Sequence, residues 1–564
     1  MSRPTRAFAP CVSSPSRRRA AAAWLHGLVL SAVVLTAGPA CGPQPEPSNR
    51  LGTTTQAVRP DTPGGDALWR YDPSDTVESY DSPEGHFRIH YTTEGRHRVS
   101  PIDQDGNGVP DRVEFVAATY EAVLATYVGD GFRPPLSDAD LSLPNGGDGR
   151  FDVYLVDFGG AADGAFQVDA CLDDGTDRCI GYMVQENDFA GYRYPSFEVA
   201  TRILASHEFF HAVQAAYDAD QGPVFGEGTA VWATEFFDPS LDDFEGFISG
   251  YLDHIDRSLD VPPPGPVQPF TYGASIFFWY LHERYGPTAV RELWEAVENG
   301  HGRPGGDDDP ADPDWYSQLD LWLADVHGSS FAEAWSEFTE WLLLTGPADD
   351  PSRAWADARA YPRPPFESPE LPYEGTGLRI FHASAHYYAF TPGAPETLRV
   401  VLVDPTDDGD DDLAGLVLHT AVERDGAVGP ISTRAAADGP VDVEVGSGET
   451  FLLVVANTQR TGQSRKPVLC VGAPDAADAC ATAHAAGSAG DAGTPDGGRS
   501  DGGADAGSGG GGDGTTGGCG CAATSRGRPP PWALLLLALG LTRGISGRSR
   551  SRRPPAIRGL DPRG

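Results

Sequence analysis

Two histidines and a glutamate in LASHEFFHAVQAAYD, residues 204–218, have the spacing of a metal-binding helix. Residues four apart lie on one face of an α-helix, so His207 and His211 can direct both imidazoles at a single ion. Glu208 then lies beside the ion, where its carboxylate can take a proton from a bound water. The segment is apolar nearly all round, which predicts a buried helix whose polar side chains need partners. A zinc ion would satisfy all three side chains.

A catalytic zinc site needs a third protein ligand and leaves the fourth position for water. Glu227, in the segment GEGTAVW, is predicted to open the next helix and follows His211 after a gap of fifteen residues (212–226). Glu235, further along the same helix, is the competing candidate. We favour Glu227, and we expect the other glutamate to orient a ligand histidine. The predicted catalytic cofactor is Zn²⁺.

HEFFH followed by GEGTAVW resembles the gluzincin metallopeptidases, which carry an HExxH…E ligand set. The gap between the two segments is shorter here than is usual in that family. The resemblance implies that His207, His211 and Glu227 bind zinc and that Glu208 is the general base. It also implies a hydrolase that acts on peptide bonds.

A tyrosine further along the chain extends the resemblance. In this group of peptidases, a downstream tyrosine projects into the cleft and donates a hydrogen bond to the developing oxyanion. Tyr272, in PFTYGASIFFWYLHERYG (269–286), is the matching position, and a core aromatic is the competing interpretation. The stretch 86–345 is similar to a group of secreted myxobacterial metalloproteases. Protein or peptide substrates outside the cell are therefore implied.

The segment DQDGNGVPDRVE, residues 103–114, has the ligand spacing of an EF-hand-type calcium loop. Gly108 stands at the sixth position, where such a loop turns sharply. No helix is expected before the loop, so the pattern predicts a single structural Ca²⁺ site; a turn without metal is the alternative. The predicted ligands are Asp103, Asp105, Asn107, the carbonyl of Val109, Asp111 and Glu114.

Apolar periodicity predicts the elements that must position these side chains. The expected strands are 86–92, 149–158 and 179–187, and the expected helices include 196–217, 227–237, 241–254, 272–285, 288–299, 315–326 and 330–343. From residue 378, short β-branched segments separated by turns predict a β-sandwich. The expected fold class is α+β, with a mostly helical zincin-like domain that contains a small sheet, followed by an all-β sandwich.

Changes of composition divide the chain. We predict a signal peptide (1–40), a spacer (41–85), the metallopeptidase domain with its calcium loop (86–345), a Pro-rich linker (346–377), the β-sandwich (378–474), a low-complexity Gly/Ala/Asp linker (475–518) and a Cys-containing C-terminal tag (519–564).

Both ends of the chain have the features of export signals. The arginine-rich start and the apolar run AAAAWLHGLVLSAVVLTAG are typical of a signal peptide. Cys41 then fits the acylated cysteine of a bacterial lipoprotein signal, and cleavage after Ala40 is the alternative. At the other end, GGCGC, a short apolar run and an arginine-rich tail resemble the myxobacterial C-terminal sorting tag, and a plain tail anchor is the alternative. Processed termini are therefore expected to attach the protein to the outer cell surface.

Composition and cysteine usage agree with export. The 564 residues carry a formal net charge of −40, from 41 Lys+Arg and 81 Asp+Glu, which argues against nucleic-acid partners. The neighbouring pairs Cys171/Cys179 and Cys470/Cys480 predict two local disulfides in an oxidising compartment. We expect a monomeric, surface-displayed zinc endopeptidase. The alternative is a non-catalytic, calcium-stabilised surface binding protein or adhesin on a metallopeptidase fold.

Overall fold

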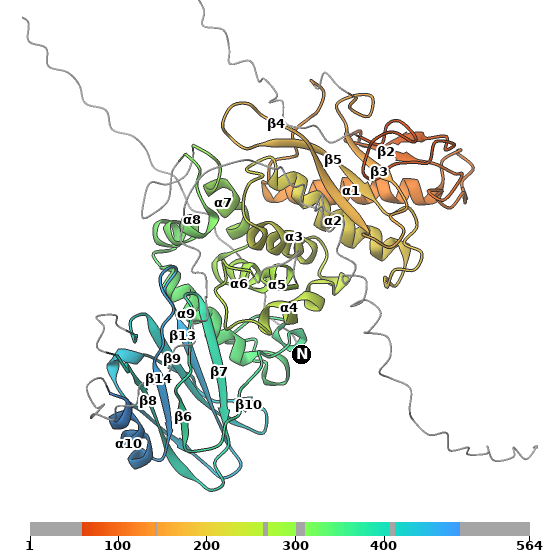
Figure 1. Ribbon diagram of the computed structural model, residues 1–564. Coiled ribbons are helices and arrows are strands. Elements are labelled where there is room, and N and C mark those ends of the chain that lie inside the picture. The colour runs from red at the N-terminus through yellow and green to blue at the C-terminus, as the bar shows by residue number, and fades with distance from the viewer. Residues whose placement is uncertain (1–58, 141–143, 263–268, 301–310, 407–411, 486–564) are drawn as a thin grey trace, which may run out of the picture. The chain divides into compact units, whose positions relative to one another are not determined.

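The computed structural model of the chain describes residues 59–140, 144–262, 269–300, 311–406 and 412–485 (Figure 1). Within these ranges the protein is α+β, as predicted. The predicted signal peptide, Cys41 and the C-terminal tag lie outside the described residues. In the described ranges, every helix is too short or too polar to cross a lipid bilayer.

Helices occur near every range where the sequence predicts one. In the described residues they are α1 (Asp111–Asp130), α2 (Phe197–Gln214), α3 (Pro223–Phe237), α4 (Phe244–Leu252), α5 (Pro269–Gly273), α6 (Ser275–Tyr285), α7 (Ala289–Ala296), α8 (Trp315–Trp322), α9 (Phe331–Trp341) and α10 (Pro474–His484). The single helix expected at 272–285 is two helices, α5 and α6.

Two strands of the first sheet, β1 and β4, were not predicted from the sequence. The strands of the first sheet are β1 (Glu78–Asp81), β2 (Phe87–Tyr91), β3 (Phe151–Leu155), β4 (Gly164–Cys171) and β5 (Cys179–Gln185). Those that follow are β6 (Tyr373–Gly375), β7 (Ser384–Phe390), β8 (Glu396–Val403), β9 (Leu416–Arg424), β10 (Ala427–Val428), β11 (Ser432–Ala435), β12 (Val441–Val445), β13 (Thr450–Asn457) and β14 (Val468–Gly472).

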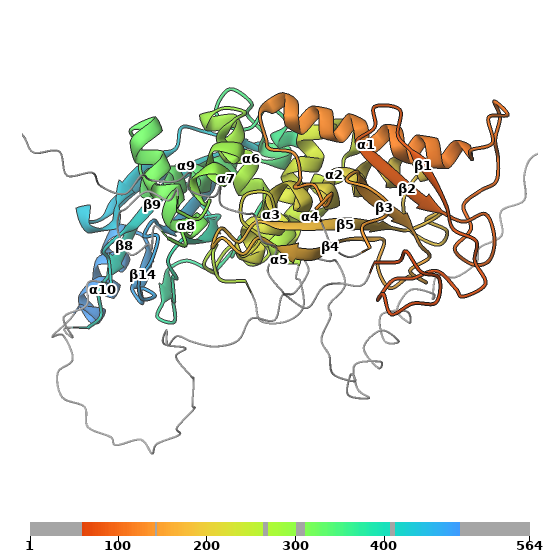
Figure 2. The ribbon, with the colours of Figure 1, turned by 90° about the horizontal axis from the view of Figure 1, so that it is seen from above.

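A five-stranded mixed sheet in the order β1-β2-β3-β5-β4 supports the catalytic candidate residues. β2, β3 and β5 are parallel, and β1 and β4 run antiparallel to their neighbours at the two edges. Alternate residues of a strand point to opposite faces. Ile89 and Val153 pack with α1 and α2 on one face (Figure 2), whereas Tyr154 and Tyr182 pack with Tyr71 on the other.

Helices α2 and α3 lie against each other and carry the candidate ligands. The side chain of Ser196 caps α2 by accepting a hydrogen bond from the backbone N–H of Val199. Helix α3 begins with Pro223, at a position where a missing N–H costs nothing. A Cβ at Gly228 would come within 2.6 Å of the Phe278 ring on α6, so glycine in GEGTAVW lets α3 pack closely on that helix.

The C-terminal strands form a sandwich of two antiparallel sheets around a second core. One sheet has the order β10-β9-β13-β7, with β11 also paired to β9, and the other has the order β12-β8-β14-β6. Helix α10 packs on β8 and β14, and the disulfide Cys470–Cys480 joins it to β14. The other predicted disulfide, Cys171–Cys179, closes the hairpin of β4 and β5.

Three segments predicted as spacer or linker contain ordered structure. The spacer expected over 41–85 includes β1 and a buried arginine, Arg59. The Pro-rich linker expected over 346–377 contains β6 and the fully buried Trp355. The linker expected over 475–518 begins with most of α10. Proline and small residues suggested an exposed chain, but Arg59, Trp355 and the Cys470–Cys480 disulfide each attach one of these segments to the folded core.

Candidate metal centre

Helices α2 and α3 bring three of the predicted ligands together. Oε2 of Glu227 lies 3.4 Å from Nε2 of His207 and 3.5 Å from Nε2 of His211. All three side chains are buried. Glu227 lies one turn inside α3 rather than at its start, because the helix already begins at Pro223.

The spacing of these atoms suits metal ligands better than an ion pair. Charge-assisted hydrogen bonds between imidazolium and carboxylate close to about 2.7–2.9 Å. A tetrahedral ion with ligand bonds of about 2.0–2.1 Å holds neighbouring ligand atoms about 3.4 Å apart. Nε2 of His207 and Oε2 of Glu227 are buried and have no hydrogen-bond partner among the described residues. Two imidazoles and one carboxylate are also a donor set that catalytic zinc uses, so the residues fit this ion.

The electrostatics of the centre keep the glutamate and one histidine charged. Burial lowers the pKa of His211, but the carboxylate of Glu227 outweighs burial and raises this pKa to about 9. Burial likewise raises the pKa of Glu227, yet the two imidazoles hold it well below its usual range. A metal ion that binds here must therefore displace a proton from His211.

Gln214 orients one of the histidines, a role that the sequence analysis missed. Nδ1 of His211 lies 2.8 Å from Oε1 of Gln214, while Nε2 of Gln214 donates to the carbonyl of Gly226 and the hydroxyl of Thr229. These two donations fix Oε1 as an acceptor, so Nδ1 of His211 carries a proton and Nε2 faces Glu227. The signal was available, because Gln214 follows His211 by three residues on the same helical face.

Glu208 is fully buried beside the ligands. One ligand atom from each of His207, Glu208 and His211 lies within 4.8 Å of the other two. Oε2 of Glu208 accepts a hydrogen bond of 3.1 Å from the backbone N–H of Phe166. Phe166 belongs to β4, the edge strand of the sheet. The unpredicted strand therefore holds the carboxylate of the candidate base at the sheet edge.

Tyr272 also lies at the centre. Its ring centroid is 5.7 Å from that of His207, and its ring also stacks on Phe247 of α4, with the centroids 5.1 Å apart. The side chain is partly buried and not enclosed in the core. The hydrogen-bonding role of its hydroxyl toward an oxyanion stays a prediction.

Glu235, the competing third ligand, lies in a different environment, and a ligand histidine is oriented by Gln214 and not by Glu235 as expected. Burial raises its pKa to about 8, and the neighbouring carboxylates of Glu245 and Asp357 add to the rise. The ion pairs with both histidines are made by Glu227. Glu227 is therefore the glutamate that the structure brings to the candidate centre.

The predicted calcium loop folds around its first ligand. The carboxylate of Asp103 accepts hydrogen bonds from the backbone N–H groups of Gly106, Asn107 and Gly108. Gly108 has a φ of +94°, in agreement with the sharp turn expected at this position. The backbone N–H of Val109 donates to Oδ1 of Asn107 at 2.8 Å.

The remaining calcium candidates are only partly brought together. The Asn107 side-chain amide donates to both Asp105 and Glu114, whereas Asp111 accepts hydrogen bonds from Gln104. The groups of three or more metal-binding side chains found among the described residues do not include this loop. Calcium would have to draw the carboxylates closer.

Two other groups of metal-binding side chains do not fit a metal. In one group, Glu374, Cys480 and His484, the cysteine sulfur is already used in a disulfide. In the other, Asp72 and Asp75 lie near His97, whose Nδ1 accepts a hydrogen bond of 2.9 Å from the backbone N–H of Asp157. Burial lowers the pKa of His97, so the neutral ring carries its proton on Nε2 and offers no lone pair to an ion.

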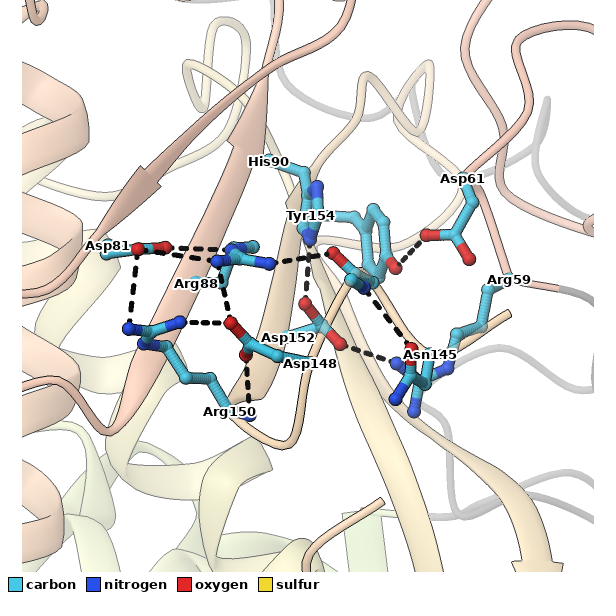
Figure 3. A network of polar contacts seen from close by, with 12 residues as sticks. Arg59, Asp61, Asp81, Arg88, His90, Asn145, Asp148, Arg150, Asp152 and Tyr154 are labelled. Carbon is cyan, nitrogen blue, oxygen red and sulfur yellow. Dashed lines mark hydrogen bonds and ion pairs between the residues drawn. The ribbon is translucent and has the colours of Figure 1, made fainter. Parts of the chain in front are cut away.

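A second buried charged cluster was not predicted from the sequence. Arg59 donates hydrogen bonds to Asp152 and Asp169 and forms an ion pair of 2.7 Å with Asp138. Nε2 of His90 lies 2.7 Å from the Asp152 carboxylate, and Figure 3 shows the contacts of Asp152 with His90 and with Arg59. Arg59 thereby ties the N-terminal segment to β3 and β4. We call Arg59, Asp138, Asp152 and Asp169 the arginine cluster.

No protein-family model matches the sequence, and a search of curated proteins finds no match. The resemblance to gluzincins therefore depends on the residues of the candidate centre and stays a prediction.

Proposed function

We propose that the chain is an exported, surface-displayed, zinc-dependent endopeptidase that hydrolyses extracellular proteins or peptides. The observation that carries this proposal is the position of Glu227 Oε2, 3.4 and 3.5 Å from two buried imidazole nitrogens. His207, His211 and Glu227 would hold the ion. Bound zinc would supply a Lewis acid that lowers the pKa of water toward about 7 and polarises a carbonyl group.

Glu208 would move the proton. Its carboxylate takes a proton from the attacking water and delivers it to the leaving amine. The hydrogen bond from Phe166 keeps the carboxylate oriented during both transfers. The hydroxyl of Tyr272 would donate a hydrogen bond to the oxyanion that develops on the scissile carbonyl.

The edge strand β4 would bind the substrate backbone. Among the described residues β4 pairs with β5 alone, and its Phe166 N–H bonds to Glu208, so the rest of this edge lies beside the candidate base. Extended peptides commonly bind by adding a strand to such an edge. A bound chain would then pass the candidate base with its carbonyl groups held in a fixed register.

The test is Glu208→Gln in the purified protein, loaded with zinc and supplied with a mixed peptide library. The amide keeps the shape of the side chain and loses the basic oxygen, so cleavage should fall at least about 100-fold while zinc content is unchanged. Equal cleavage by variant and wild type, or no cleavage by the wild type, would contradict the proposal. The second result would favour a non-catalytic surface binding protein.

We also propose that the loop 103–114 binds a structural Ca²⁺. The hydrogen bonds from Asn107 to Asp105 and Glu114 support a site that forms when the ion draws these groups together. With zinc in excess, removal of calcium should lower Tm, and Asp103→Asn should remove the difference. A melting curve that calcium leaves unchanged would rule the site out.

A further inference from the structure

The carboxylate of Asp243, at the start of α4, has no hydrogen-bond or ion-pair partner among the described residues. Asp243 stands at the N-cap of α4, a position where aspartate usually accepts a hydrogen bond from the helix backbone. Here the Asp243 side chain makes no capping hydrogen bond. Among the described residues it also forms no side-chain hydrogen bond or ion pair. The carboxylate is therefore available to a group that comes from outside the chain.

The position of Asp243 places it near the metal ligands. Asp243 has helical backbone angles, so it shares a face of α4 with Phe247, four residues further along. The Phe247 ring stacks on Tyr272, which in turn lies beside His207. The side chain of Asp243 is partly buried, so it remains in contact with solvent.

A second carboxylate approaches from the sheet. Asp163 directly precedes β4, and its carboxylate accepts a hydrogen bond from the Tyr194 hydroxyl. Burial raises the pKa of Asp243 to about 6, the His207 imidazole opposes the rise, and Asp163 adds to it. His207 and Asp163 therefore both lie close enough to Asp243 to influence its charge. Neither has an arginine or lysine partner among the described residues.

We propose that Asp243, assisted by Asp163, selects substrates that carry a lysine or arginine side chain next to the scissile bond. The proposal depends on the peptidase activity proposed above. A partly buried carboxylate without a partner attracts a cationic group strongly, because a charged hydrogen bond there meets little competition from water. The same two residues would repel a glutamate or aspartate side chain in that position.

The experiment compares N-acetylated, C-amidated peptides that differ at one position, which holds lysine, norleucine or glutamate. Norleucine has almost the shape of lysine without its charge, and the capped ends remove terminal charges. The parent sequence comes from the best-cleaved member of a capped library. Wild type should cleave the lysine peptide with kcat/KM about ten-fold above the norleucine peptide, and the glutamate peptide least.

The variant Asp243→Asn should bring the lysine-to-norleucine ratio near one, with little effect on the norleucine peptide itself. Asp163→Asn should lower the ratio less, and Asp243→Arg should favour the glutamate peptide. The matched control Asp438→Asn removes an exposed carboxylate from the sandwich and should leave the ratio unchanged. Zinc content and Tm establish that each variant is folded.

The outcomes separate this proposal from the proposed function. If wild type cleaves peptides and Glu208→Gln does not, but Asp243→Asn and Asp163→Asn keep the wild-type ratio, the selectivity proposal is wrong and the peptidase stands. Cleavage that requires a free α-amino group would also overturn it, because the cation would then be the chain end. If zinc-loaded wild type cleaves no peptide, both proposals fail.

Discussion

The candidate metal centre and the arginine cluster are both buried groups of positive and negative side chains, but the distances between their opposite charges differ. In the arginine cluster, Arg59 is in direct contact with its acids, at 2.5 Å from Asp152 and 2.7 Å from Asp138. In the candidate metal centre, Glu227 stays 3.4–3.5 Å from both imidazoles, and Nε2 of His207 and Oε2 of Glu227 lack hydrogen bonds among the described residues. One cluster is closed by its own side chains, and the other leaves room for an ion.

On physical grounds, this difference distinguishes an ion network closed by its own side chains from a candidate metal site. Buried opposite charges that only balance each other should approach to hydrogen-bond distance, because direct contact is the interaction that offsets the cost of removing them from water. Ligands of a common ion stay further apart, because each is bonded to the ion. Substitutions in the two clusters should therefore have different effects. Those in the candidate metal centre should weaken zinc binding, and those in the arginine cluster should lower the stability of the fold.

The largest expected effect is on zinc binding in Glu227→Gln. The amide lacks the negative charge that balances the ion, so zinc affinity should fall by more than about 100-fold. This loss exceeds the loss of about 10–100-fold expected when a residue that only hydrogen-bonds to a ligand is removed. Competition with a chelator measures the affinity. The matched control is Glu235→Gln, a buried glutamate of the same helix, which should keep wild-type affinity. The opposite pattern would make Glu235 the third ligand.

The next effect is on stability in Arg59→Met. Removing the cation leaves three buried carboxylates facing one another, so the free energy of unfolding should fall by about 3–5 kcal/mol at neutral pH. Urea denaturation followed by tryptophan fluorescence measures the change. Arg70→Met, at an exposed arginine of the same segment, is the control and should be close to wild type. Equal midpoints for both variants would mean that the arginine cluster does not anchor the N-terminal segment.

A smaller effect is expected for Gln214→Leu. Without the acceptor, His211 is no longer held in the tautomer that faces Glu227, so zinc affinity should fall about 10–100-fold. Gln214→Glu keeps an oxygen acceptor and should retain most of the affinity. If the leucine variant binds zinc as tightly as wild type, the orientation of His211 is set by packing alone.

Much of the metal centre could be predicted from the sequence because its parts are local. The spacing of His207, Glu208 and His211 determines their positions on one helix, whatever surrounds it. The sequence favoured Glu227 over Glu235 but could not settle the choice, since it depends on how α3 crosses α2. Asp243 gave no signal either, because its type suits a helix cap and only the structure reveals that it does not cap.

The secondary structure likewise contains elements that the sequence predicted and elements that it did not. Long helices with apolar faces were predicted nearly to their ends, because side-chain burial repeats along them. β1 and β4 were missed: ESYD offers no apolar alternation, and GAFQVDAC contains small residues and a buried aspartate, Asp169. The position of Arg59 follows from contacts with residues 93 and 110 positions away, which no local pattern encodes.

The smallest expected effect concerns pH and the arginine cluster. Burial raises the pKa of Asp138 to about 7, although Arg59 opposes the rise. An unfolded chain releases this proton near pH 4, so between about pH 4 and 7 the folded state binds more protons than the unfolded state. The contribution of Asp138 to stability therefore decreases as the pH rises through this range and is constant above it.

Asp138→Asn should remove this contribution. The variant and wild type should have similar Tm values near pH 5, whereas at pH 8 the variant should melt a few degrees higher, because it no longer buries an uncompensated charge. Taking the difference between the two melting curves cancels the acid stabilisation expected of any strongly negative protein. Asp140→Asn, at an exposed position of the same loop, is the control and should give no pH-dependent difference. A variant that melts lower than wild type at pH 8 would mean that the Arg59–Asp138 pair stabilises the fold, which would make the arginine cluster a fully compensated network rather than one with an excess of acid.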